Sequence, residues 1–490
     1  MKALVLTTLL WVVTLADAQP PDTLWTRIYG GANSDEARCM TRAQDGGFVL
    51  GGYTSSFGSG NHDLYVVKTD GSGALEWSVV CGGQSGDECY GISTCPNGAF
   101  IAAGNTWSFG PGVPDWCNIY VVRFTANGDT VWTRVFGGDR DDFANGVCAT
   151  SDGGGIVTGM TRSYGTSTFH FDMYLLKITA NGDSEWMQTY GGAQTNEEGW
   201  GVLSLACGGY VAAGSTTGGS GSSDVYVVRT DSLGTATWIT QFSIDQGDYP
   251  RAIHVVPGGF VIAGSAAPDT LSRASKMFLA RLDDNGDTLW TKLYSGNGFD
   301  LECYDMQVTM DGGYILAGVT YDPFPFPAWS NSYLIRTDSA GNELWRGEYG
   351  QYYEDEGHAV AALDDGSYVI AGSVHTLGAA WDDYLVRTER DPALVIRDRA
   401  VHAPSAIQLS AYPNPFNSAT VFSFSLPHTA NVELKVYDVT GRLVQTLSQA
   451  KLPAGEHEIK LDAGAWPSGI YFARMQAGAV SKTVKIALIR

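Results

Sequence analysis

Basic residues are scarce in this sequence of 490 residues, in which 30 Lys and Arg stand against 52 Asp and Glu and give a formal net charge of −22. The acidic excess lies entirely before residue 410. Because phosphate groups would be repelled by such a surface, we expect neither nucleic acid nor an anionic membrane as a partner. Cations, basic proteins and neutral glycans are compatible with it.

Long apolar runs are also missing beyond the N-terminus, where no stretch approaches the ~20 apolar residues of a membrane-spanning helix. Residues 1–18 instead have the pattern of a signal peptide, with Lys2, an apolar core at 3–15 and small residues at 16 and 18. We therefore predict an exported protein without a transmembrane segment, either secreted or held at the outer-membrane cell surface.

Several catalytic and metal-binding motifs are absent. The sequence has no CxxC, no GxSxG and no HExxH, which argues against a zinc ribbon, a thioredoxin-like site, an α/β-hydrolase and a zinc protease. The eight cysteines lie between Cys39 and Cys303 at irregular spacing. Export permits disulfides, but the spacing does not say which cysteines pair.

What the sequence has in abundance is repetition. A Trp that precedes an aromatic–Gly ending recurs roughly every 52–55 residues, and a Gly-containing turn and a run like DLYVVKTD (63–70) recur with it. The Trp positions are Trp25, Trp77, Trp132, Trp186, Trp238, Trp290 and Trp345. Fixed periods of this length with four short strands each are typical of propeller blades.

The first complete repeat predicts strands at 37–43, 48–54, 64–69 and 75–80. Alternation in the third strand places Lys68 outward, and the Trp of the fourth strand is expected to fill the space between neighbouring blades. The mature chain, after the predicted signal peptide, begins with a lone fourth strand at 24–29, whereas the seventh repeat, 355–388, supplies only three strands. We therefore predict an all-β fold in which residues 19–390 form a seven-bladed β-propeller closed by the N-terminal strand.

Loops between second and third strands vary in length and are rich in aromatic residues. Variable loops on a rigid scaffold are where binding usually occurs, although the same aromatics would also keep the loops ordered by folding back on the blades. The candidate ligand-binding residues are Phe57, Trp107, Phe109, Trp116, Tyr164, Phe169, Phe326, Trp329 and Trp381.

Acidic residues recur before the first strand of each repeat. Their recurrence favours a scaffold role, in which a carboxylate accepts hydrogen bonds from loop N–H groups. A ring of carboxylates would also suit Ca²⁺, which prefers oxygen ligands, and two of them would suit a glycosidase pair. The candidate metal ligands are Asp35, Asp87, Asp142, Asp248, Asp300 and Asp355; no other cofactor and no catalytic residue is predicted.

The repeat resembles tandem bacterial β-propeller repeats of the form W..YGG…D.A……DGG.V.AG.T.S…..D.YVVK.D..G over residues 24–388. The spacing from Gly73 to Trp77 is also similar to the docking repeat of pyrroloquinoline-quinone propellers. That resemblance departs at the Ala and Thr of the docking repeat, and in a blade count of seven rather than eight. Both resemblances describe the fold more than the function.

A different pattern follows a linker at 391–409. Period-two alternation over 410–490 predicts a small antiparallel, immunoglobulin-like sandwich of six or seven strands. This segment resembles the type A C-terminal sorting domain of the type IX secretion system, which implies export across the outer membrane, and the secretion machinery as a partner. A flagellar-hook-type immunoglobulin-like domain has a similar pattern. The resemblance is carried by Tyr412, Pro413, Asn414, Pro415, Gly441, Gly455, Gly469, Tyr471, Lys482 and Lys485.

Together these observations predict an exported propeller that recognises or adheres to a glycan or protein without catalysis. Two other functions remain open: an extracellular enzyme (a carbohydrate-active hydrolase or lyase, or a quinoprotein) and a structural surface-layer component. Two inward carboxylates unlike their counterparts in other blades would favour the enzyme.

Overall fold

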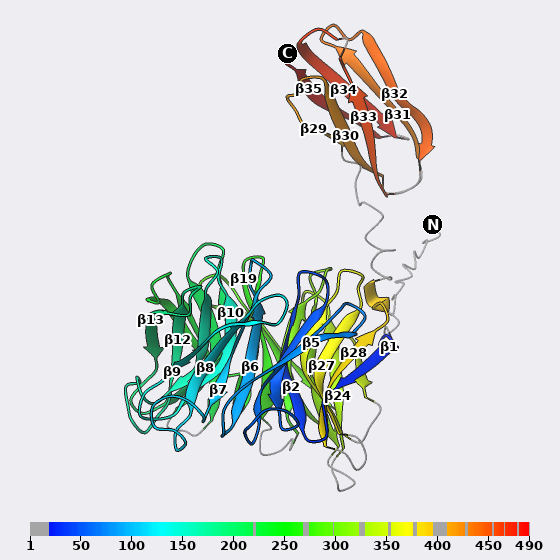
Figure 1. The fold of residues 1–490 in the computed structure, drawn as a ribbon. Coiled ribbons are helices and arrows are strands. Elements are labelled where there is room, and N and C mark those ends of the chain that lie inside the picture. Colours follow the sequence, from blue (N-terminus) through cyan, green and yellow to red (C-terminus); the bar gives the residue numbers. More distant parts are fainter. Residues whose placement is uncertain are drawn as a thin grey trace, which may run out of the picture. The chain divides into compact units, whose positions relative to one another are not determined.

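The computed structural model describes residues 19–218, 222–267, 274–296, 298–322, 329–350, 354–375, 380–394, 409–426, 430–452, 455–464, 466–477 and 480–489. The chain divides into two compact units, Met1–Asp391 and Pro392–Arg490, which we call the repeat unit and the C-terminal unit. Both consist of β-strands (Figure 1). No helix among the described residues is long and apolar enough to cross a membrane.

The repeat unit opens with β1 (Thr23–Tyr29), and six four-stranded repeats and a three-stranded seventh follow. The strands of repeats 1 to 3 are β2 (Asp35–Arg42), β3 (Phe48–Thr54), β4 (Asp63–Thr69), β5 (Leu75–Cys81), β6 (Asp87–Thr94), β7 (Phe100–Thr106), β8 (Asn118–Phe124), β9 (Thr130–Phe136), β10 (Asp142–Ala149), β11 (Gly155–Thr161), β12 (Asp172–Ile178) and β13 (Ser184–Tyr190). Those of repeats 4 to 7 are β14 (Asn196–Ser204), β15 (Tyr210–Thr217), β16 (Ser223–Thr230), β17 (Ala236–Phe242), β18 (Gly247–Val256), β19 (Gly259–Ala267), β20 (Lys276–Leu282), β21 (Thr288–Ser295), β22 (Asp300–Val308), β23 (Tyr314–Asp322), β24 (Trp329–Thr337), β25 (Glu343–Tyr349), β26 (Glu354–Ala362), β27 (Tyr368–His375) and β28 (Trp381–Thr388).

Within each repeat the strands pair antiparallel in chain order. The predicted strands of the first repeat agree with β2 to β5. The outward placement of Lys68 was wrong, because every residue of β4 is buried. The sheet is covered on both faces, so its third strand is apolar throughout rather than alternating. Lys68 Nζ compensates for its burial with ion pairs to Asp45 at 2.9 Å and Glu76 at 2.6 Å.

The recurring Trp lies between neighbouring sheets, as the sequence predicted. Trp77 of β5 packs against Gly128 in the next repeat, where φ is +89° and an added Cβ would lie 2.7 Å from the indole. Trp77 Nε1 also donates to the carbonyl oxygen of Ala126 at 3.1 Å. Trp132 repeats this contact through the carbonyl oxygen of Ala180 at 3.0 Å. The glycine therefore gives room for the indole of the preceding repeat.

The two ends of the repeat unit meet. β1 pairs antiparallel with β28, with Tyr29 opposite Asp383, and Figure 1 shows the blue β1 beside the yellow β28. A buried cluster joins Leu50 and Val67 of repeat 1 to Val369 and Leu385 of repeat 7. The first and last repeats thus pack together through the strand that precedes them, in a propeller-like arrangement of sheets.

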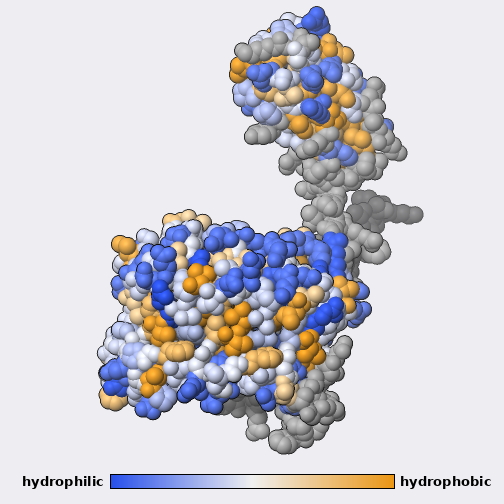
Figure 2. Space-filling view, viewed as in Figure 1, coloured by the Kyte–Doolittle hydropathy of each residue, from blue (hydrophilic) through white to orange (hydrophobic). Residues whose placement is uncertain are grey.

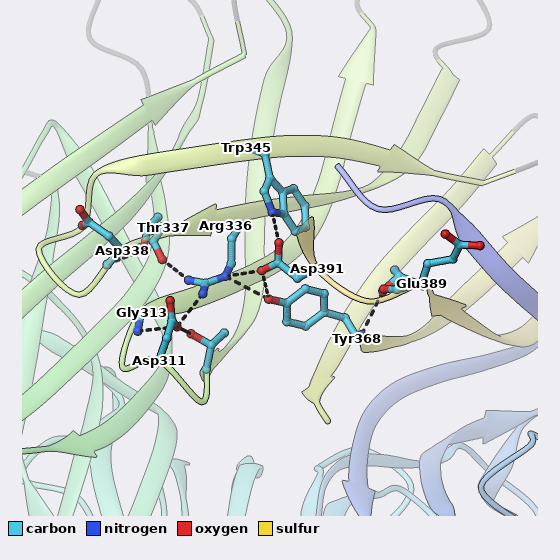
Figure 3. Close-up of polar contacts among 11 residues, drawn as sticks. Asp311, Gly313, Arg336, Thr337, Asp338, Trp345, Tyr368, Glu389 and Asp391 are labelled. Atoms are coloured by element: carbon cyan, nitrogen blue, oxygen red, sulfur yellow. Dashed lines mark hydrogen bonds and ion pairs between the residues drawn. The ribbon is translucent and has the colours of Figure 1, made fainter. Parts of the chain in front are cut away.

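Repeat 7 has no fourth strand of its own, so the chain leaves the unit after β28. In earlier repeats the Trp indole donates to a backbone carbonyl in a turn of the next repeat. Trp345 of repeat 6 instead donates from Nε1 to Asp391 Oδ1 at 2.8 Å. Asp391 Oδ2 accepts from Arg336 Nε at 2.9 Å and from the Tyr368 hydroxyl at 2.6 Å (Figure 3). The Arg336 and Asp391 side chains are both fully buried. This network fixes the end of the repeat unit.

The flank of the repeat unit is partly apolar, and Figure 2 shows orange apolar residues spread over it between polar ones. The fourth strands contribute several exposed large apolar side chains. They include Leu75, Val131, Ile239, Leu289 and Leu293.

In the C-terminal unit the described strands form two sheets, β29-β30-β33 and β32-β31-β34-β35. Their bounds are β29 (Leu409–Tyr412), β30 (Ala419–Leu426), β31 (Ala430–Asp438), β32 (Leu443–Leu452), β33 (Gly455–Asp462), β34 (Gly469–Ala477) and β35 (Val480–Leu488). Both sheets contribute to one buried core, which includes Phe422 and Phe424 of β30 and Leu434 and Val436 of β31.

Several residues that carried the resemblance to sorting domains hold this unit together. Asn414 Nδ2 donates to the carbonyl oxygen of Lys485 at 2.8 Å and its Oδ1 accepts from Ala487 N at 3.0 Å, which ties the start of the unit to β35. Gly441 has φ +83° in the turn between β31 and β32. The Tyr471 hydroxyl donates to the carbonyl oxygen of Pro467 at 2.8 Å.

Candidate functional site

The aromatic residues predicted to bind a ligand make contacts of several kinds where the structure describes them. Phe57 and Phe109 fold back on the third strands of their own repeats, each with its ring centroid 5.8 Å from a tyrosine, Tyr65 and Tyr120 respectively. Trp107 lies edge-on to Phe143 with the ring centroids 6.2 Å apart. These contacts order the loops.

The remaining predicted aromatics are placed separately. Trp116 packs close to Gly112, and the Tyr164 hydroxyl donates to the carbonyl oxygen of Gly137 at 2.7 Å. Phe169 is 83% exposed. Trp381 lies with its ring centroid 5.4 Å from that of His375. Phe326 lies outside the described residues, and Trp329 begins β24 with a side chain that also lies outside them.

The predicted acidic residues bind their own loops. Asp35 accepts from Gly31 N and Ser56 Oγ, both at 2.7 Å, and from Thr54 Oγ1. Asp87 accepts from Gly83 N at 2.8 Å and Ser108 Oγ at 2.7 Å. The pattern gives each carboxylate the scaffold role that its recurrence suggested.

Two other acids follow the same pattern: Asp142 accepts from Gly138 N at 2.8 Å and Asp248 from Ile244 N at 2.7 Å. Asp300 differs, because it accepts from Ser275 N at 2.7 Å, in the loop before β20 of the preceding repeat. Asp355 is buried. Within the described residues, no group of three or more His, Cys, Asp or Glu side chains has the geometry to hold a metal ion. Calcium binding stays a prediction.

A different set of residues comes together at the centre of the repeat unit. The first strand of each repeat carries a β-bulge, at which one residue has no partner on the second strand. A bulge re-aims a side chain, and bulges are frequent beside active sites. The bulge residues are Arg38, Tyr90, Asn145, Trp200, Arg251, Tyr304 and His358.

All of these bulge residues line one cavity of about 480 Å³. This is the size range of small-molecule sites. The seven bulge positions hold five residue types, with Arg and Tyr each present twice, whereas the turns and buried strands around them are nearly uniform. The residues that line the central cavity therefore vary between repeats more than the residues of the surrounding turns and strands.

Neighbouring bulge residues contact one another around the cavity. Arg251 Cζ lies 3.6 Å from the ring centroid of Trp200, and the ring centroids of Tyr304 and His358 are 5.0 Å apart. Arg38 Cζ lies 5.5 Å from the ring centroid of Tyr90. His358 Nδ1 is 2.8 Å from the carbonyl oxygen of Ala37 in repeat 1. The cavity wall thus continues from repeat 7 to repeat 1.

Glutamates two residues before the bulges hold several of these side chains. The Tyr304 hydroxyl donates to Glu302 Oε2 at 2.6 Å, and Arg38 pairs with Glu36 at 3.0 Å. His358 Nε2 lies 3.1 Å from Glu356 Oε2. Three carboxyl groups, those of Glu36, Asp305 and Glu356, line the cavity with the two guanidinium groups of Arg38 and Arg251, so the lining carries little net charge.

Asp305, the residue after the bulge in β22, differs from its counterparts. The same position holds Cys39, Gly91, Gly146, Gly201, Ala252 and Ala359 in the other repeats. Burial raises the pKa of Asp305 to about 7, although the backbone N–H groups of Val360 and Met306 donate to its carboxylate. Burial also opposes the ionisation of Glu356, but the hydrogen bond with His358 holds the pKa of that carboxyl below its usual value.

Reasoning from the sequence missed the bulge residues because no single residue type recurs at all seven positions. A bulge is a change of register in the backbone and leaves no fixed residue signature. One signal was available in the sequence: the residue type changes between repeats at the third position after the recurring acid, as in Arg38 after Asp35 and Tyr90 after Asp87.

Comparison with known proteins gives one assignment and several likenesses. Residues 410–489 match the secretion system C-terminal sorting domain. The chain therefore carries a type IX sorting domain and is secreted or held at the cell surface. No curated protein matches this sequence.

Solved structures resemble the chain only at low identity. A protein of unknown function from Dyadobacter fermentans DSM 18053 is 11% identical, with 75% of this chain and 98% of that chain covered and a TM-score of 0.44. Trypanosoma rangeli sialidase in complex with the inhibitor DANA is 11% identical, with 85% and 86% covered and a TM-score of 0.37. PorZ, a surface component of the type IX secretion system of Porphyromonas gingivalis, is 9% identical, with 95% and 100% covered and a TM-score of 0.16. Likeness at this level says nothing about activity.

Proposed function

We propose that this chain is a type IX-secreted surface protein whose repeat unit, a closed seven-bladed propeller over 19–390, recognises a neutral or cationic glycan without catalysis. The 18-residue signal peptide precedes the propeller, and a linker at 391–409 joins it to the immunoglobulin-like sorting domain, which engages the secretion machinery. The observation that carries the proposal is the convergence of unlike bulge residues, one from each first strand, on a single cavity.

The chemistry of the cavity suits a sugar. Carboxylates and guanidinium groups such as Glu356 and Arg38 make paired hydrogen bonds to neighbouring hydroxyls, and aromatic rings such as Tyr90 and Tyr304 offer apolar surface to the faces of a sugar ring. The fixed strands position these groups before the ligand arrives, which lowers the entropic cost of binding. The net charge of −22 on the whole chain disfavours an anionic sugar.

A glycan-array screen of the mature chain, with and without Ca²⁺, tests this function, and Tyr304→Ala and Trp200→Ala locate the site. We expect selective binding that each substitution weakens at least tenfold, or about 1.4 kcal/mol. Phe169→Ala, which removes an exposed loop aromatic, is the matched control and should bind as the unchanged protein does. Thermal unfolding of each variant shows that it is folded.

Two results would contradict the proposal. Loss of binding in the Phe169 variant but not in the cavity variants would place the site on the loops. A blank array in both conditions would favour the structural surface-layer function instead.

One observation favours an enzyme as the second candidate. Asp305 is an inward carboxyl unlike its counterparts, and its pKa of about 7 lies well above the lowered pKa of Glu356. Two carboxyls whose environments separate their pKa values are a general pattern of acid–base catalysis.

If the cavity hydrolyses glycosides, the rate should fall above pH 7 in the unchanged protein as Asp305 loses its proton. Asp305→Asn is then expected to lower kcat by 10²-fold or more, the usual contribution of general acid catalysis. An assay of aryl glycosides between pH 5 and 9 checks both points. Hydrolysis that is unchanged in Asp305→Asn would rule this residue out as the acid.

A further inference from the structure

Three residues of repeats 1 and 2 depart from the repeat pattern together. Cys39 follows the bulge in β2, and Cys89 precedes the bulge in β6. Cys39 is opposite Gly51 of β3, a position that is Ala or Thr in the other six repeats. Those residues are Ala103, Thr158, Ala213, Ala263, Ala317 and Ala371.

These departures bring two sulfurs together. Cys39 Sγ and Cys89 Sγ lie 3.8 Å apart, and a Cβ added at Gly51 would lie 2.9 Å and 2.7 Å from them. The missing side chain at Gly51 is what leaves space for both sulfurs. The corresponding partner of Cys303, which occupies the position of Cys89 in repeat 6, is Ala252, so that thiol has no such neighbour.

We propose that Cys39 and Cys89 form a disulfide in the exported protein and so cross-link the first strands of repeats 1 and 2. Formation of the bond brings the two sulfurs from 3.8 Å to the ~2.05 Å of an S–S bond. The two thiols lose two protons, and two electrons pass to the disulfide of a thiol–disulfide exchange oxidant, which leaves as two thiols. Exported proteins meet such oxidants. This inference does not depend on the proposed function.

The bond has to form before the repeats finish packing. Cys89 is buried and Cys39 partly buried, and burial, together with the neighbouring Cys89, raises the pKa of the Cys39 thiol well above its usual value. Exchange requires a thiolate and access for the oxidant. We therefore expect oxidation during folding to be faster than oxidation of the folded, reduced protein.

Mass spectrometry of the mature full chain, exported to an oxidising periplasm and digested without reduction, tests the proposal. The expected result is one cross-linked peptide pair that contains Cys39 and Cys89 and is two hydrogens lighter than the thiols. The other six cysteines should be alkylated as free thiols. Eight alkylated thiols, or a link from Cys39 or Cys89 to another cysteine such as Cys81, would overturn it.

Single substitutions test whether Cys39 and Cys89 form the bridge and whether Gly51 provides the space for it. Cys39→Ser should leave Cys89 as a free thiol, whereas Cys148→Ser should leave the bridge intact. Gly51→Ala should lower the bridged fraction because its Cβ would overlap both sulfurs. Gly218→Ala, with no heavy atom within 4 Å of its added Cβ, is the matched control. An unchanged bridged fraction in Gly51→Ala would contradict the geometry.

Discussion

Replacement of Asp391 by alanine is expected to destabilise the repeat unit by about 3–5 kcal/mol, the cost of removing one partner from a buried ion pair. Arg336, which has no access to water, would keep only its second ion pair, with Asp311 at 2.6 Å, and Trp345 Nε1 and the Tyr368 hydroxyl would each lose an acceptor (Figure 3). Asp391 is also the residue that stands in for the missing turn of repeat 7. Its loss should loosen the junction of repeats 6 and 7.

Equilibrium urea unfolding of the mature chain, followed by tryptophan fluorescence, measures this effect. The matched control is Asp364→Ala, because Asp364 forms an ion pair with Arg42 at 3.1 Å but its side chain is 93% exposed. Such a pair contributes about 0–1 kcal/mol. Asp391→Asn keeps an acceptor for Trp345, so its unfolding midpoint should lie between those of Asp391→Ala and Asp364→Ala. Equal midpoints for Asp391→Ala and Asp364→Ala would show that the network is not needed for stability.

The architecture could be predicted because its signals are local and repeated. The turn before Phe48 and the apolar run from Leu64 to Val67 fix the strands, and the Trp at 77 marks the contact between sheets. Seven copies of each signal reinforce one another. Lys68 was misplaced because alternation assumes one solvated face, whereas these sheets are covered on both.

The site could not be predicted in the same way. Recurring acids such as Asp35 are conspicuous in the sequence, yet they bind Gly31 and Ser56 in their own loops. Arg38, three residues later, reaches the cavity because one extra backbone residue interrupts the pairing of Ala37 and Cys39 with β3. Register depends on tertiary packing, so the residues that differ most between repeats gave the weakest signal.

The junction of β1 and β28 contains a second strong determinant of stability, Asp383. The equivalent third-strand residue is apolar in repeats 1 to 5, as at Leu64 and Ile119, whereas Asp383 is only 2% exposed and lies opposite Tyr29 of β1. No hydrogen bond from any described residue reaches its Oδ1. Burial, with the charges of Asp35 and Asp382, raises its pKa well above the usual value.

The raised pKa makes stability depend on pH. Below the pKa of the unfolded chain, about 4, the carboxyl is protonated in both states and its stabilising contribution is fully present. As the pH rises towards the pKa of the folded protein, only the unfolded chain ionises freely, so the free energy of unfolding falls. The unchanged protein should therefore be less stable at pH 8 than at pH 5 through this group.

Asp383→Asn is expected to remove this fall in the free energy of unfolding at high pH, because an amide of the same shape stays neutral. The gain should be near zero at pH 4 and on the order of 1–3 kcal/mol at pH 8, the range for a buried polar group without a partner. Thermal unfolding of both proteins between pH 4 and 9 measures it, and Asp115→Asn in an exposed loop is the control. Asp305 changes the free energy of unfolding with pH to a similar extent in both proteins, so its contribution cancels when the two proteins are compared. A gain that is the same at pH 4 and pH 8, or absent at both, would show that burial beside the N-terminal strand does not oppose the ionisation of Asp383.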